Sequence, residues 1–201
     1  MASNGKGSDV DGAGPDAGAD RVLRRLDRAV RSGELIRVRR GIRGADRIEG
    51  FAVAATPGWT LLAVCTDIRL DGFAAVRTAD ITEVRCRGDE TCLTVRALRR
   101  RGQWPVCLPG PALPLDELAG LLEAADRGFG LVAVSRERQA PDACWIGAVA
   151  ELRPKSLRLH EVDPDAHWHT GVSKFRFKDI TRVDFGGRYE RTLCEFAGPR
   201  P

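Results

Sequence analysis

The chain contains the pattern Asp-Ile-Thr-Xaa-Val twice, beginning at Asp80 and again 99 residues later at Asp179. Two further segments match in the same order. Residues 26–38 align with residues 122–134 at an offset of 96, and residues 47–59 align with residues 144–156 at an offset of 97. The offset grows slowly in one direction, as small loop insertions would make it. The sequence therefore predicts a tandem duplication that covers nearly everything after the first twenty residues.

Each copy shows the same succession of elements. A helical segment opens each copy, at residues 20–33 with Asp20 as its N-cap and at residues 114–128, and a short helix closes each copy, at residues 90–101 and 188–196. Between them lie short strand-like runs, several of which alternate apolar and polar residues. These runs are residues 35–40, 48–56, 59–64, 72–77 and 81–86 in the first copy, and residues 130–135, 145–152, 156–162, 174–178 and 180–185 in the second.

Five short strands and one helix are too few for a flat open sheet with a covered face. Curling the strands into a small barrel removes the exposed edges, and Gly50 and Gly147, each inside a strand, fit sharp bends. We therefore predict a mainly β fold with flanking helices, made of two tandem five-stranded barrels, each preceded by a helix. The expected domains are a disordered tail at 1–20, a first repeat at 21–110 and a second repeat at 111–201.

Two segments resemble the Sm-like branch of small β-barrels. Residues 49–62 are similar to its first motif, in which a glycine precedes alternating apolar positions, a turn and paired leucines. Residues 175–185 resemble the second motif of the bacterial host-factor RNA chaperone, where an aromatic-lysine step precedes the last strand. SH3-like barrels share much of this pattern, and the Asp-Gly-aromatic strand at Asp71 is similar to one in uncharacterised bacterial proteins. The resemblance implies an N-terminal helix followed by five strongly bent strands.

The residues with which Sm-like proteins bind uridine do not have counterparts in this chain. Sm-like uridine pockets use an Asp and an Asn in the turn after the first motif, and the corresponding turns here read Thr-Pro-Gly-Trp and Arg-Pro-Lys-Ser. The resemblance therefore favours the fold more than the ligand.

Composition narrows the class of protein. The first twenty residues hold almost no large apolar side chain, no segment reads as an export signal, and no run reaches the roughly 18 apolar residues of a membrane span. We expect a cytoplasmic protein with no membrane partner, in which the cysteines are reduced; no pair of them has C-x-x-C spacing. They are Cys65, Cys86, Cys92, Cys107, Cys144 and Cys194.

The sequence carries no motif of a known catalytic site. No nucleophile elbow, phosphate loop or dinucleotide fingerprint is present. His160, His167 and His169 lie close together and leave a metal pair geometrically open, but a third ligand at metal-site spacing is missing. We therefore predict no enzyme, no cofactor and no metal, with a metal- or cysteine-dependent enzyme as a trailing alternative.

Arginine is the strongest functional signal. The chain has 28 Arg and 4 Lys, and ten of the arginines fall between residues 21 and 47. Such a stripe is typical of surfaces that bind phosphates. A solvated helix face in an arginine-biased proteome would give the same sequence pattern. The residues predicted to contact nucleic acid are Arg24, Arg28, Arg31, Arg39, Arg40 and Arg43.

Four tryptophans are candidates for base stacking, and Trp59 and Trp168 lie at turns, where a binding surface is expected. We predict a protein that binds nucleic acid, RNA before DNA. The alternative is a protein–protein adaptor that uses barrel edges or the Trp-bearing turns. The oligomeric state stays open.

Overall fold

The computed structural model describes residues 15–108 and 112–200, which form four helices and ten strands. The helices are α1 (Pro15–Ser32), α2 (Leu93–Arg100), α3 (Leu118–Phe129) and α4 (Arg188–Ala197). The strands of the first half are β1 (Leu35–Arg40), β2 (Ile48–Ala55), β3 (Trp59–Thr66), β4 (Arg69–Arg77) and β5 (Ile81–Gly88). Those of the second half are β6 (Val132–Ser135), β7 (Cys144–Arg153), β8 (Ser156–Val162), β9 (Trp168–Arg176) and β10 (Arg182–Phe185).

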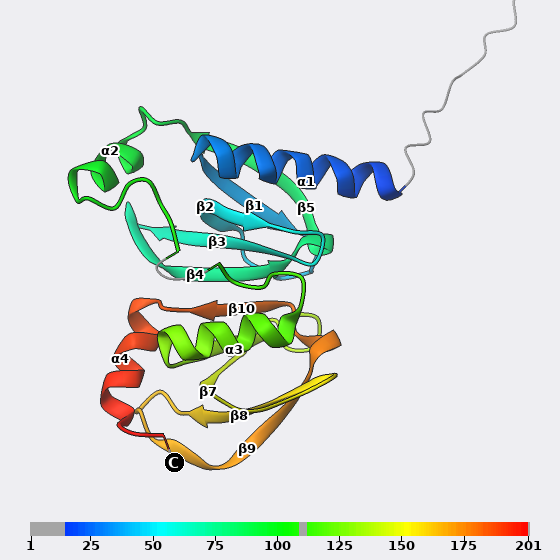
Figure 1. Cartoon of the computed structure of the whole chain (residues 1–201), viewed down its shortest axis with the longest axis vertical. Coiled ribbons are helices and arrows are strands. Elements are labelled where there is room, and N and C mark those ends of the chain that lie inside the picture. The colour runs from blue at the N-terminus through cyan, green and yellow to red at the C-terminus, as the bar shows by residue number, and fades with distance from the viewer. Residues whose placement is uncertain (1–14, 109–111, 201) are drawn as a thin grey trace, which may run out of the picture.

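The ten strands form one sheet in the order β5-β1-β2-β3-β4-β10-β6-β7-β8-β9, and all neighbours are antiparallel (Figure 1). The predicted mainly β class is confirmed. Two separate, closed barrels are not what the described residues form, because β4 pairs with β10 of the other half instead of closing onto β5. The sheet is open, with β5 and β9 at its ends.

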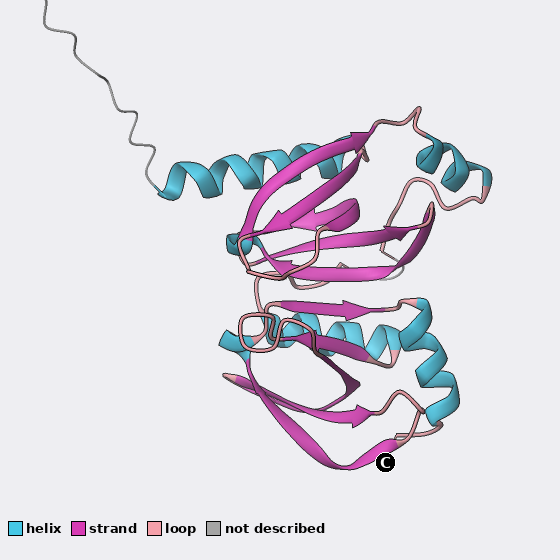
Figure 2. Ribbon diagram, turned by 180° about the vertical axis from the view of Figure 1, so that it is seen from behind, coloured by secondary structure: helices cyan, strands magenta, loops and turns pink. Residues whose placement is uncertain are grey.

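The two halves have the same internal order of strands. Counted within each half, the fifth strand lies beside the first, and the second, third and fourth follow. The order is what two copies of one unit would produce, and the duplication itself stays an inference from the sequence. In the ribbon view each half curves around its own side of the molecule (Figure 2).

Equivalent strands bend at equivalent places. A Cβ atom on Gly50 in β2 would lie 2.1 Å from the carbonyl oxygen of Ala63, and one on Gly147 in β7 would lie 2.1 Å from that of His160. The pairing register then shifts between Ala52 and Ala54 in β2, and between Val149 and Glu151 in β7. Only glycine permits so close a backbone approach, and the bulge that follows turns the strand.

The first helix starts earlier than the sequence indicated. We expected a disordered tail up to residue 20 and a cap at Asp20, but α1 already begins at Pro15. Asp20 therefore lies inside the helix. Residues 1–14 of the predicted tail lie outside the described residues.

A shared core joins the halves across the predicted domain boundary. The buried side chains of Trp59, Leu61 and Ala75 in the first half pack in one cluster with α3 and with β6, β8 and β10 of the second. At the β4–β10 joint, the rings of Phe73 and Phe185 stack with centroids 5.6 Å apart. The predicted boundary near residue 110 thus separates two sets of strands, and one hydrophobic cluster crosses it while further clusters lie within each half.

Candidate nucleic-acid interface

Helix α1 buries one side and exposes an arginine-rich flank. Its own residues Leu26 and Ala29 are fully buried on the side that faces the sheet. Positions 21, 24, 25 and 28 follow helical spacing, so their side chains leave the helix as neighbours. Arg21, Arg24 and Arg28 are exposed.

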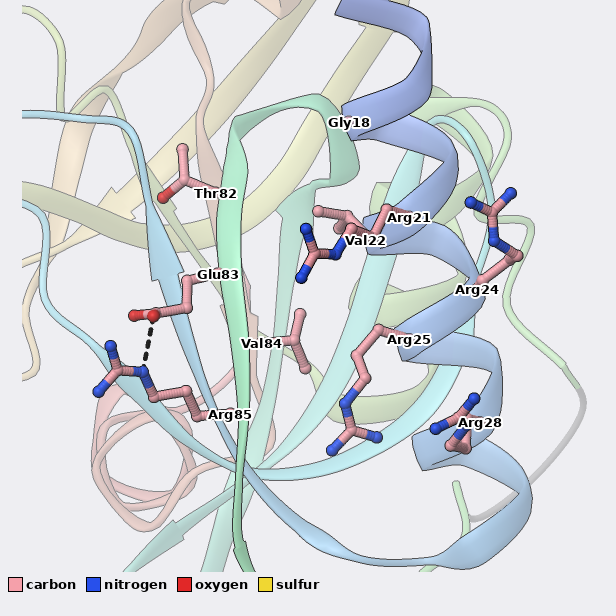
Figure 3. A pocket seen from close by; sticks show the side chains of 10 residues that line it. All are labelled: Gly18, Arg21, Val22, Arg24, Arg25, Arg28, Thr82, Glu83, Val84 and Arg85. Atoms are coloured by element: carbon pink, nitrogen blue, oxygen red, sulfur yellow. Dashed lines mark hydrogen bonds and ion pairs between the residues drawn. The ribbon is translucent and has the colours of Figure 1, made fainter. Parts of the chain in front are cut away.

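A groove of about 670 Å³ runs between this flank and the edge strand β5 (Figure 3). In Figure 3, Arg21 and Arg25 extend from the helix toward β5, while Arg24 projects on the far side of the helix. We call this feature the arginine groove, and it is lined by Gly18, Arg21, Val22, Arg24, Arg25, Arg28, Thr82, Glu83, Val84 and Arg85. Five lining residues are arginines and one is acidic, so the lining carries a net positive charge.

One of these arginines is fixed by a partner. Both Nη atoms of Arg25 donate to the carboxylate of Glu34, with an Nη2–Oε2 distance of 3.2 Å. This hydrogen bond raises the pKa of Arg25 and lowers the pKa of Glu34. Arg25 therefore shapes the groove wall more than it offers free charge.

The other groove arginines differ in how far their charge is paired with a neighbouring carboxylate. Arg24 lies 3.9 Å from Asp20 with both side chains largely in solvent, a contact that contributes little. Arg85 donates to Glu83 at 2.6 Å along the strand. Arg21 and Arg28 form no ion pair with any side chain in the described part of the chain. They are the groove's freest cations.

The structure brings together only part of the predicted stripe. Of the six predicted residues, Arg24 and Arg28 belong to the lining of the groove. Arg31 at the end of α1, Arg39 in β1 and Arg43 in the following loop are exposed but lie outside its lining.

Arg40 is not a surface residue. Its side chain is 0% exposed and pairs with Glu137, which lies 97 positions along the chain. A partner so distant in the sequence could not be inferred from the acidic residues near Arg40. We therefore leave Arg40 out of the interface.

Of the two tryptophans expected at a binding surface, Trp59 is buried and Trp168 is half-buried. Trp59 is 3% exposed and packs in the shared core, with the guanidinium of Arg77 5.0 Å above its ring. The indole of Trp168 is half-buried, and its Nε1 donates to the carbonyl of Ala197 at 3.0 Å. Trp59 therefore presents no free stacking face, whereas the Trp168 ring stays partly accessible.

Sequence reasoning missed a second basic surface, at the far end of the sheet. It surrounds a cavity of about 490 Å³ at the β7–β8 turn and the end of β9. We call it the lysine patch, and its lining is Pro154, Lys155, Ser156, Lys174, Arg176, Phe177 and Lys178. No acidic residue lines it, and none of its four cations forms an ion pair with another described side chain. The available signal was that three of the chain's 4 lysines fall within residues 155–178.

The three histidines lie in a region of local hydrogen bonds. The Nε2 of His160 lies 2.6 Å from the carbonyl oxygen of His169, and Asp163 accepts the backbone N–H of His167 at 2.9 Å. Within residues 15–108 and 112–200, no group of three or more His, Cys, Asp or Glu side chains is placed to hold a metal ion.

A third cavity, of about 540 Å³, lies at the joint between the halves. Two carboxyl groups that line it have raised pKa values. Burial raises the pKa of Asp184 in spite of its ion pair with Arg182, and burial together with Asp184 raises the pKa of Glu190. Glu190 sits in the first turn of α4, where the backbone amide of Gly187 hydrogen-bonds to it. Each carboxyl group thus already has a structural partner: Asp184 pairs with Arg182 within β10, and Glu190 accepts from the Gly187 amide at the start of α4.

None of the described helices is both long and apolar enough to cross a membrane. Comparison with protein-family models, with curated proteins and with solved structures finds no match to this chain.

Proposed function

We propose that the protein is a non-enzymatic nucleic-acid-binding protein and that the arginine groove is its contact surface. One observation supports this most: five arginines from two elements line one groove with a single carboxylate among them. Guanidinium groups bind phosphate oxygens in a planar, two-pronged way and remain charged at any physiological pH. A linear row of phosphates is the ligand whose charge matches a groove of this kind.

The groove contacts the phosphate backbone, which RNA and DNA share. The preference for RNA comes from the resemblance to RNA-binding small barrels and is a separate part of the proposal. The lysine patch is a second surface of the same sign, where Phe177 stands between Arg176 and Lys178 and supplies an apolar face beside the charges.

The test measures binding of the full chain to fluorescently labelled single-stranded RNA and DNA across a salt series. The double variant Arg24→Glu with Arg28→Glu should weaken binding at least tenfold. It should also reduce the slope of log affinity against log salt by about 1.4, because each lost phosphate contact on a single strand contributes about 0.7.

A matched control is available on α2. Arg96 and Arg100 are exposed, four residues apart on a helix, and not part of the groove lining. Changing both to glutamate alters the net charge equally and should leave most of the affinity intact. Equal losses in the two double variants would show that only net charge matters and would remove the groove from the proposal.

The alternative is a protein–protein adaptor. The turn at Trp59 no longer favours it, since that indole is buried. Trp168 is only half-buried, and α4 exposes Tyr189 at 52% and Phe196 at 73%. An adaptor predicts a partner that stays bound in high salt and after nuclease treatment, and that is lost with Phe196→Ser.

A further inference from the structure

The sheet ends in two strands that have a neighbour on one side only. Among the described residues, β5 pairs with β1 alone and β9 pairs with β8 alone. Such an edge presents a row of unpaired N–H and C=O groups to which another strand can be added.

The joint inside the chain shows how two such edges meet. Residues 73–76 of β4 pair antiparallel with residues 182–185 of β10. Arg77, at the end of β4, reaches across the joint: its Nε donates to the carbonyl of Ile180 at 2.7 Å, and its Nη2 donates to the carbonyl of Phe177. The joint therefore combines a strand ladder with an arginine that clamps the turn leading into the partner strand.

The two free edges carry the counterparts of this joint. In strand order, β9 closes the second half as β4 closes the first, and β5 begins the first half as β10 begins the second. The offset of 99 that aligns the two Asp-Ile-Thr-Xaa-Val stretches places Arg176 on Arg77, and Ile81 on Ile180.

Arg176 has the position that the clamp requires. It ends β9 directly before a 3-10 turn, as Arg77 ends β4 before the same kind of turn. Its side chain is exposed and has no hydrogen-bond or ion-pair partner in the part of the chain that the structure describes. By contrast, the guanidinium of Arg77 is half-buried and satisfied by the joint.

We propose that a second copy of this chain adds its β5 to β9 of the first, antiparallel and in the register of the internal joint. That register sets Val172 opposite Cys86 and Phe175 opposite Glu83. Val172 is 43% exposed and Cys86 is exposed, with its thiol beside Glu34. The contact is head-to-tail, and each added copy offers a new β9, so growth continues until a ring closes or the chain of copies stays open.

Charge makes this contact weaker than the internal joint. The lysine patch flanks β9 and the arginine groove flanks β5, so the approaching surfaces are both basic. In addition, Val172 and Cys86 replace the stacked Phe73 and Phe185. Salt screens repulsion between exposed charges, and association should therefore strengthen as salt is raised.

The test is a disulfide between copies. In the nuclease-treated full chain at 0.5 M salt, the variant Val172→Cys should form multimers of the 21.9 kDa chain on mild oxidation, with the introduced thiol joined to Cys86 in peptide mass spectra. Adding Cys86→Ser should abolish the ladder. Thr192→Cys, an exposed position on α4, controls for random contact and should give no such link to Cys86.

Light scattering of the unmodified chain at low and high salt completes the test. Association that rises with salt, together with the disulfide between position 172 of one copy and Cys86 of the next, supports the proposal. A monomer at every concentration with no link would overturn it. A disulfide formed mainly between the introduced thiols of two copies would overturn it as well, because that pairing belongs to a two-fold contact.

Discussion

Single residues in this protein show how poorly charge in the sequence reports charge at the surface. Arg24 and Arg28 could be placed on one flank of a helix from helical spacing alone, and the structure adds the groove beside that flank. Arg40 could not be placed, since its partner Glu137 is brought to it only by the tertiary fold. The prediction that Trp59 lies on a binding surface failed for a related reason. Its turn is covered by the second half, and Thr56 in that turn donates to the carbonyl of Leu115 at 3.1 Å.

The buried pair Arg40–Glu137 should contribute strongly to stability once formed. Glu137 accepts from the Nη2 of Arg40 at 2.6 Å and from the hydroxyl of Thr181 at 2.7 Å. Glu137→Ala leaves the guanidinium buried without its partner, and we expect a loss of about 3–5 kcal/mol in the free energy of unfolding. The double variant Arg40→Met with Glu137→Leu should lose much less. Urea unfolding measures both, and a double variant as unstable as the single one would contradict the pair's role.

The same pair makes stability depend on acidity. Burial alone would raise the pKa of Glu137, but the hydrogen bonds from Arg40 and Thr181 outweigh it and lower the pKa. The stabilisation is therefore complete above the ordinary value of 4.5 and is lost as pH falls through the lowered folded value.

The existence and order of the helices and strands could be predicted from the sequence. The residues at which they end, and the strands with which they pair, were harder to predict. All ten strand-like runs are strands, because alternation with turn residues between runs is a local signal. The start of α1 was missed by five residues, since a fitting cap residue at Asp20 was taken as the helix start although the helix continues past it.

The bends in β2 and β7 offer a test at this scale. Gly50→Ala should lower the free energy of unfolding by about 1–3 kcal/mol, because the new Cβ would overlap the carbonyl of Ala63 and force the strands apart. Gly171→Ala in β9 is the control, since that position has nothing within 4 Å. Equal thermal midpoints for the two variants would mean that the close approach at Gly50 is not needed.

For the whole molecule, the sequence predicted the halves but not the way they join. Repetition of a pattern indicates two similar units, and each unit can satisfy its edges either by closing on itself or by pairing with its neighbour. The residues that decide between these outcomes, Phe73 and Phe185, lie 112 positions apart and show no mutual signal in the sequence. The pairing that results leaves the arginine groove beside one free edge of the sheet and the lysine patch beside the other.

The central claim, that the arginine groove binds nucleic acid, is tested most directly by ultraviolet cross-linking of bound single-stranded RNA to the full chain, with the modified peptides identified by mass spectrometry. We expect adducts within residues 18–28 and 82–85, and we expect them to disappear in the Arg24→Glu, Arg28→Glu variant but persist in the Arg96→Glu, Arg100→Glu control. Adducts confined to other segments, in a sample where RNA is demonstrably bound, would contradict the claim.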